Sequence, residues 1–170
     1  MDIYQILAEH QIEYERCDHP PVFTVEEARR LTPCLPGAKT KNLFICDHKS
    51  KKHFLIVLEA HKRIKLKTLA EVLSVKKVRF ASPERLMQYL GITPGAVSLL
   101  AVVNDQEKAV EVVIDSHLWK SAKAFLCHPL VNTATLVISQ HDIERLLNST
   151  GHRFRILELS TENFIPEASA

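Results

Sequence analysis

Apolar and polar residues follow two different periods along this chain, and these periods predict a mixture of helices and strands. Apolar positions three and four residues apart predict a helix over residues 2–11. Two nearly continuous apolar runs, at 42–46 and 53–58, are typical of buried strands. Because a charged segment at 47–52 separates these runs, the pattern predicts a hairpin.

Capping residues mark where several helices begin and end. Thr24 and Glu27 form a predicted capping box that opens the second helix, and Ser139 and Asp142 form another for a helix that ends at Gly151. Ser82, Pro83 and Glu84 are an N-cap, an N1 proline and a first-turn acid. Further helices are therefore predicted at 66–73 and from 83 to 91.

The remaining apolar runs predict more strands. We expect 98–103 and 109–114 to be strands that form a second hairpin around a turn at Asn104 and Asp105. Other strands are predicted at 77–80, 124–127, 133–138 and 153–159. Hairpins mixed with short helices do not fit the regular alternation of a doubly wound sheet. The predicted fold is a single α+β domain with a mixed, largely antiparallel and curved sheet flanked by short helices.

Length and composition agree with one ordinary globular domain. The chain has 170 residues, 46% of them hydrophobic and 25% charged, which is close to the average for soluble proteins. We assign residues 1–160 to this domain and 161–170 to a C-terminal tail. The apolar runs are too short to cross a bilayer and the N-terminus lacks the order of a signal peptide, so we expect a cytoplasmic protein with no membrane partner.

The cysteines and histidines do not have the spacing of a common metal site. The four cysteines form no C-x-x-C pair, and the nine histidines form no H-E-x-x-H helix motif. We therefore predict reduced thiols, no metal and no cofactor. The signatures of Walker, Rossmann and serine hydrolase sites are also absent from the sequence.

Positive charge is concentrated in one part of the chain. The formal net charge is only +2, yet residues 39–79 hold twelve lysines and arginines against three acids. Such a basic block is typical of a surface that binds a phosphate backbone, although solvated strand edges give the same pattern. The candidate RNA contacts in this block are Lys39, Lys62, Arg63, Lys65 and Lys67.

Three polar clusters lie where strands are predicted to end: 40–42, 93–98 and 128–135. Loops held by a rigid sheet are where sites are usually built. Taken singly, however, each cluster has an ordinary structural explanation, such as a solvated lysine at a strand start, a Pro-Gly turn or a histidine at a strand edge. The residues alone leave the function open.

The same clusters carry a resemblance to a known family. The chain resembles the freestanding prolyl-tRNA editing proteins, the YbaK/ProX-like deacylases that are similar to the editing insertion of bacterial prolyl-tRNA synthetase. The resemblance covers roughly residues 2–158. It rests on HPPVFTVEEA at 19–28, KTKNLF at 39–44, FAS at 80–82, ERLM at 84–87, GITPG at 91–95 and NTAT at 132–135.

This resemblance implies a hydrolase that cleaves the ester bond of mischarged tRNA(Pro). Alanyl-tRNA(Pro) is the expected substrate, the acceptor end of that tRNA the expected partner, and prolyl-tRNA synthetase a further one; no DNA is expected. The family's functional lysine matches Lys41. The residues that match its substrate pocket are Asn42, Thr93, Pro94, Gly95, Ala96, Val97, Ser98, His128, Asn132 and Thr133.

Other functions remain open at this point. Within the same class, the substrate could be cysteinyl-tRNA(Pro) or a tRNA carrying another small residue. From a different class, the chain could be a catalytically silent module that binds tRNA or a synthetase. Retention of Lys41, Asn42 and His128 together disfavours the silent module, because binding alone does not need that trio. A metal- or redox-linked regulator is disfavoured by the Cys and His spacing.

Overall fold

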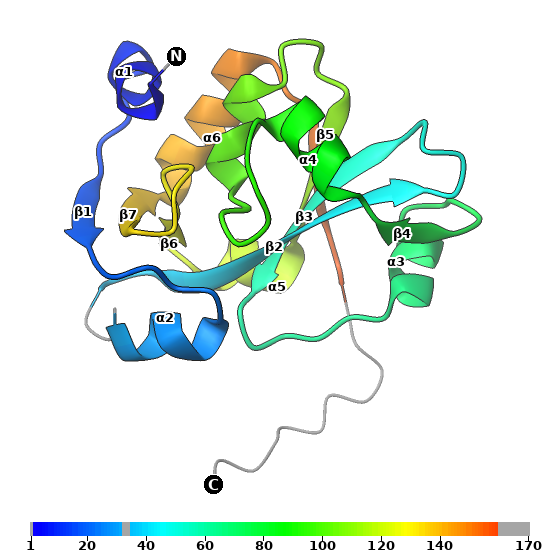
Figure 1. The fold of residues 1–170 in the computed structure, drawn as a ribbon, viewed down its shortest axis with the longest axis horizontal. Helices are drawn as coiled ribbons and strands as arrows, with labels where there is room; N and C mark the ends of the chain where they lie inside the picture. The colour runs from blue at the N-terminus through cyan, green and yellow to red at the C-terminus, as the bar shows by residue number, and fades with distance from the viewer. Residues whose placement is uncertain (1, 32–34, 160–170) are drawn as a thin grey trace, which may run out of the picture.

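The fold was analysed in a computed structural model that describes residues 2–31 and 35–159. The chain folds into an eight-stranded sheet with short helices on its faces (Figure 1). In chain order the elements are α1 Ile3–Glu9, β1 Glu15–Asp18, α2 Val25–Leu31, β2 Ala38–Asp47, β3 His53–Glu59, α3 Leu66–Val72, β4 Val78–Phe80, α4 Pro83–Leu90, the 3-10 helix η1 Leu99–Asn104, β5 Val110–Asp115, α5 Ser116–Ser121, β6 Ala124–Cys127, β7 Ala134–Ser139, α6 Gln140–Thr150 and β8 Phe154–Leu157.

The sheet is mixed, as predicted. Its strand order is β1-β7-β6-β2-β3-β5-β8, and β4 pairs with β2 beside this path. The β1–β7, β2–β3, β2–β4 and β6–β7 pairs are antiparallel, whereas β2–β6, β3–β5 and β5–β8 are parallel. The long strand β2 is therefore the link between the two halves of the sheet.

Apolar side chains cover both faces of the sheet. The larger cluster packs α1, α4, η1 and α6 against one face, with residues such as Leu7, Leu90, Leu100 and Leu147 almost completely buried. The smaller cluster packs α3 against the other face around Leu69. The predicted stripe Ile3, Ile6 and Leu7 is buried, and Asp2 caps that helix by accepting a hydrogen bond from the amide of Tyr4.

Most predicted boundaries are confirmed. The oxygen of Ser82 accepts a hydrogen bond from the amide of Arg85, and α4 ends at Gly91 in the left-handed conformation. Ser139 caps α6 as predicted, by accepting from the amide of Asp142, but the Asp142 carboxylate accepts from the Ser139 hydroxyl instead of from its amide as in a capping box; α6 ends at Gly151. The hairpin of β2 and β3 is also present, and β2 begins earlier than predicted, at Ala38.

The second predicted hairpin is wrong. Residues 98–103 do not form a strand: Leu99–Asn104 is a 3-10 helix whose five apolar residues are all buried. β5 consequently pairs in parallel with β3 and β8 instead of with the preceding segment. A continuous apolar run shows no period, so its burial on all sides did not reveal its geometry. The sequence also gave no sign of β1 and α5, and the predicted tail at 161–170 lies outside the described residues.

Candidate functional site

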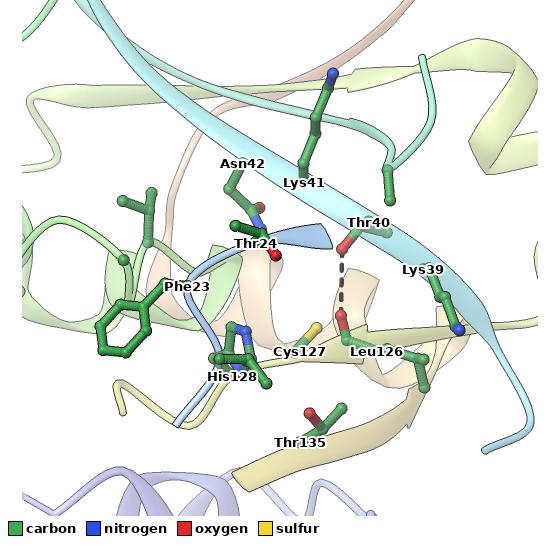
Figure 2. Close-up of a pocket in the computed structure, with 14 residues that line it drawn as sticks. Phe23, Thr24, Lys39, Thr40, Lys41, Asn42, Leu126, Cys127, His128 and Thr135 are labelled. Atoms are coloured by element: carbon green, nitrogen blue, oxygen red, sulfur yellow. Dashed lines mark hydrogen bonds between the residues drawn. The ribbon is translucent and has the colours of Figure 1, made fainter. Parts of the chain in front are cut away.

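A cavity of about 260 Å³ opens where β2 passes β6 and the segment before α2 (Figure 2). Its wall combines parts of the chain that are far apart in sequence. Its lining residues are Val22, Phe23, Thr24, Lys39, Thr40, Lys41, Asn42, Ala60, Gly95, Val97, Leu126, Cys127, His128 and Thr135. The predicted residues Lys41, Asn42, Gly95, Val97 and His128 are thus brought to one cavity.

Strand β2 lines this cavity with residues 39–42, and successive side chains leave the strand on opposite sides. Thr40 and Asn42 point from β2 toward β6, as expected for side chains two positions apart on a strand (Figure 2). The hydroxyl of Thr40 donates to the carbonyl oxygen of Leu126 at 3.2 Å and joins the two strands. Oδ1 of Asn42 is buried and has no hydrogen-bond partner among the described residues. A buried amide oxygen without a partner is costly, so this atom is suited to accept a bond from a ligand.

Lys41 leaves β2 on the other side. Its ammonium points away from His128 and Thr135 in Figure 2, although the residue contributes to the cavity wall. Burial lowers the pKa of Lys41, and the positive charge of Arg63 lowers that pKa further. An anion bound beside these two cations would favour the charged form of the lysine.

A hydrogen bond to the backbone of β7 and a ring contact with His19 hold His128 in place. Nδ1 of His128 lies 3.0 Å from the carbonyl oxygen of Ala134, so Nδ1 carries the proton and Nε2 is the acceptor of the neutral ring. Burial lowers the pKa of His128, and the nearby His19 lowers that pKa as well. The two rings lie edge to face with centroids 6.2 Å apart. His128 is therefore favoured as a neutral hydrogen-bond acceptor.

His19 connects the N-terminal segment to β7. Its Nδ1 donates to the carbonyl oxygen of Pro20 at 2.9 Å, so its Nε2 accepts from the hydroxyl of Thr135 at 2.8 Å. The amide of His19 also donates to the carbonyl oxygen of Thr133 at 2.9 Å. Thr135 lies in the cavity wall, so these bonds fix one side of the site.

The segment that carries Phe23 and Thr24 is held at both ends. Val22 and Asn132 exchange two bonds of 3.2 Å, from the Val22 amide to the Asn132 carbonyl and from Nδ2 of Asn132 to the Val22 carbonyl. The amide of Glu27 donates to Thr24 at 3.1 Å, but the Glu27 carboxylate accepts from the amide of Phe23 at 2.7 Å, one residue earlier than the predicted capping box. Asn132 therefore shapes the site by holding the backbone of Val22.

The predicted loop at 93–98 contributes only part of its length. Gly95 and Val97 line the cavity, whereas Thr93 and Pro94 are exposed and lie outside the set of lining residues. Ala96 is buried, and Ser98 is fully buried with its hydroxyl oxygen accepting a bond from the amide of Leu100 at 3.2 Å. Thr133 is exposed. Gly95 has φ +93°, a conformation that side chains rarely adopt, so the loop needs glycine there.

The thiol of Cys127 lies in the cavity wall but is not activated. Burial raises the pKa of this thiol to about 12, so it is not a thiolate near neutral pH. Within residues 2–31 and 35–159, no group of three or more His, Cys, Asp or Glu could hold a metal ion. The polar chemistry of the cavity rests on hydroxyl, amide, imidazole and ammonium groups.

The candidate RNA contacts separate into two kinds. Lys39 lines the cavity, and Lys65 and Lys67 are exposed at the start of α3. Lys62 instead donates to the carboxylate of Asp115 at 2.7 Å, and their side chains are only 15% and 0% exposed. Lys62 is therefore part of a buried ion pair. Arg63 is exposed and lies close enough to Lys41 to affect its pKa.

Sequence reasoning did not assign several wall residues to the site: Val22, Phe23, Thr24, Thr40, Ala60, Leu126, Cys127 and Thr135. The apolar ones look like core residues in the sequence. Phe23 and Thr24 belong to the HPPVFTVEEA segment and Thr135 to the NTAT segment, so the matched motifs were the available signal.

The comparison with protein families identifies the class of protein that this fold and cavity define. A family described as the aminoacyl-tRNA editing domain matches residues 19–146, which is more than half of the chain. The chain therefore belongs to the aminoacyl-tRNA editing domain family. It is an aminoacyl-tRNA deacylase, an enzyme that hydrolyses the ester between an amino acid and its tRNA.

Two relatives of the chain and one solved structure have names that refer to prolyl-tRNA or its synthetase. The chain is 39% identical over 153 residues to the prolyl-tRNA editing protein ProX of Acetoanaerobium sticklandii, covering 90% of this chain and 93% of that protein. It is 34% identical to prolyl-tRNA synthetase associated domain-containing protein 1 of Danio rerio, over 89% of this chain and 82% of the relative. A solved structure described as a candidate trans-editing enzyme for prolyl tRNA synthetase shares the fold, with a TM-score of 0.69, 17% identity, and coverage of 93% of this chain and 95% of that one.

No helix within residues 2–31 and 35–159 is both long enough and apolar enough to span a bilayer.

Proposed function

We propose that this protein is a trans-editing enzyme that removes alanine from mischarged tRNA(Pro). The observation that carries the proposal is the 260 Å³ cavity, whose lining includes His128 and Asn42, with an Oδ1 that has no hydrogen-bond partner within the described part of the chain. The relatives named for prolyl-tRNA editing support tRNA(Pro) as the substrate. We further propose that residues 1–160 form the editing domain and that it acts in the cytoplasm beside prolyl-tRNA synthetase.

We assign the aminoacyl group to this cavity. Leu126, Cys127 and Val97 give it apolar wall atoms, while Thr40 and Thr135 add hydroxyl groups to the wall. The Asn42 oxygen can accept a bond from the α-ammonium of the aminoacyl group or from the ribose 2′-hydroxyl. One methylene that fits a pocket changes affinity by only about 1–3 kcal/mol, so exclusion of proline by steric overlap is the stronger filter.

Hydrolysis needs a positioned water and stabilisation of the developing charge, because the ester is already activated. The water oxygen bonds to the carbonyl carbon, the bond from that carbon to the ribose 3′-oxygen breaks, and the 3′-oxygen takes up a proton. No protein nucleophile is required, which agrees with the high pKa of the Cys127 thiol. We assign the substrate's own 2′-hydroxyl to positioning the water.

His128 is suited to orient a donor in this site. Its protonated Nδ1 donates a hydrogen bond to the Ala134 carbonyl oxygen, so Nε2 of the neutral ring is free to accept one. We assign Nε2 to the attacking water or to the α-ammonium of the substrate. Backbone amides of the loop around Gly95 are the proposed donors to the carbonyl oxygen, since glycine allows close approach.

Lys41 is the proposed functional lysine, and its orientation favours a role at the phosphate. The ammonium points away from His128 and lies near Arg63, so these two cations suit the phosphate of the terminal nucleotide better than the ester carbonyl. A compact ammonium with three donors fits this task and need not lose its proton. Lys39, Lys65 and Lys67 are the proposed contacts to the rest of the acceptor end.

The test is the deacylation rate of alanyl-, prolyl- and cysteinyl-tRNA(Pro) with wild type, Lys41→Ala and Lys120→Ala. Lys120 is an exposed lysine of α5 and serves as the matched control. We expect the wild type to release alanine and neither proline nor cysteine. This release should be abolished in Lys41→Ala and unchanged in Lys120→Ala. Release of cysteine instead of alanine would establish the alternative substrate, and no release from any of the three would point to a different aminoacyl group or to a silent binding module.

A further inference from the structure

Phe23 is an exposed aromatic residue at the mouth of the cavity. It is 72% exposed, the highest value among the exposed large hydrophobic residues of the described chain. It nevertheless lines the cavity, and in Figure 2 its ring lies on the side opposite Lys39. Exposure of a whole aromatic ring forgoes its hydrophobic stabilisation, so a ligand that covers the ring would recover it.

The backbone that carries this ring is fixed. Its own amide donates to the Glu27 carboxylate at 2.7 Å, and the preceding residue exchanges two bonds with Asn132. The ring is therefore presented from a held position, which lowers the entropy cost of binding a partner on it.

Gly95 defines the space next to the ring. A Cβ built on Gly95 would lie 3.7 Å from Cδ1 of Phe23, so the loop backbone runs along one edge of the ring. Glycine at this position keeps the gap between loop and ring free of side-chain atoms. The result is a flat apolar surface directly beside the cavity mouth.

We propose that Phe23 stacks on the 3′-terminal adenine of the tRNA and positions the ester in the cavity. This inference rests on the proposed function. When the aminoacyl group occupies the cavity, the ribose lies at its mouth and the base just outside. In Figure 2 Lys39 lies across the cavity from Phe23 and the ammonium of Lys41 lies beyond β2, so phosphate and base are held on different sides. Aromatic rings are the usual platforms for unpaired bases.

The experiment measures kcat and KM for alanyl-tRNA(Pro) with Phe23→Ala, Phe23→Tyr and Phe23→Leu. Phe80→Ala is the matched control, because Phe80 is 57% exposed and lies on β4, outside the set of cavity residues. We expect Phe23→Ala to raise KM roughly 5- to 150-fold with a smaller change in kcat. Phe23→Tyr should keep the wild-type KM, because it keeps an aromatic ring. Phe23→Leu should have a KM between those of the wild type and Phe23→Ala. Inhibition by AMP should weaken by a similar factor in Phe23→Ala, and inhibition by ribose 5-phosphate should not.

The outcomes separate the two proposals. If the wild type releases alanine but Phe23→Ala behaves like Phe80→Ala, or if Phe23→Leu equals the wild type, the stacking inference is wrong while the editing function stands. If the wild type releases no amino acid, the proposed function fails first. Thermal unfolding at the wild-type temperature in Phe23→Ala would show that a raised KM does not come from lost folding.

Discussion

Lys62→Met is the substitution whose effect the structure defines most sharply. The lysine was a candidate RNA contact from sequence, yet its ammonium lies 2.7 Å from the Asp115 carboxylate, which is completely buried. The other oxygen of Asp115 accepts from the amide of Leu159 at 3.1 Å. Removing Lys62 would leave that carboxylate buried with the Leu159 amide as a hydrogen-bond donor and no cation beside it. We therefore expect a structural defect instead of a binding defect.

The magnitude follows from the burial of both partners. Breaking a buried ion pair by removing one partner costs about 3–5 kcal/mol. For a domain of this size, 1 kcal/mol shifts the melting temperature by about 2–4 °C, so the expected decrease in Tm is about 6–20 °C. The loop after β3 should loosen as well, because the amide of Ala60, a cavity residue, bonds to the Lys39 carbonyl at 2.8 Å only two residues before Lys62.

The assay is thermal unfolding followed by circular dichroism, with two comparison variants. Lys67→Met removes an exposed lysine and should change stability by less than about 0.5 kcal/mol. Lys62→Met combined with Asp115→Asn should regain most of the lost stability, because the amide oxygen can still accept from Leu159 and no charge remains buried. A Tm loss below about 3 °C, or a double variant no better than the single one, would refute the reasoning. In tRNA binding, the salt dependence should weaken in Lys67→Met and not in Lys62→Met.

The remaining predictions concern three residues of the cavity: His128, Cys127 and Gly95. Burial lowers the pKa of His128 below its ordinary 6.5. The deacylation rate should therefore not change as the pH falls to 6.5, and it should decrease only at lower pH, where Nε2 becomes protonated. A pH–rate profile of the wild type and of His128→Gln checks this. The same shift makes the unfolded chain bind the proton more readily, so the stability that the neutral ring contributes is fully present above pH 6.5 and is lost as the pH falls below it. Cys127→Ser should keep most of the activity, and iodoacetamide at pH 8 should not inactivate the wild type, because the thiol pKa is about 12; rapid inactivation blocked by the substitution would contradict this. Gly95→Ala should cost about 1–3 kcal/mol in stability through its φ of +93°, and a Tm equal to that of the wild type would show that the loop relaxes freely.

Local signals in the sequence determined much of the secondary structure. Ser82 and Gly91 fix the two ends of α4, and Ser139 and Gly151 fix those of α6, because a cap satisfies backbone groups within a few residues of itself. The hairpin of β2 and β3 is also local, since a short charged turn brings its strands together. The matched motifs led to the family as well.

The tertiary structure decided what local patterns leave open. The apolar run at 98–103 has no period that separates a helix from a strand, and only the fold shows that Leu99–Asn104 is a 3-10 helix and that β5 pairs with β3 and β8. The cavity depends on distant contacts, such as the bond between His19 and Thr135, which are 116 residues apart. Lys62 is a second example. The sequence shows that this residue carries a positive charge, but whether the charge forms a buried ion pair or contacts a phosphate depends on which groups the fold places beside it.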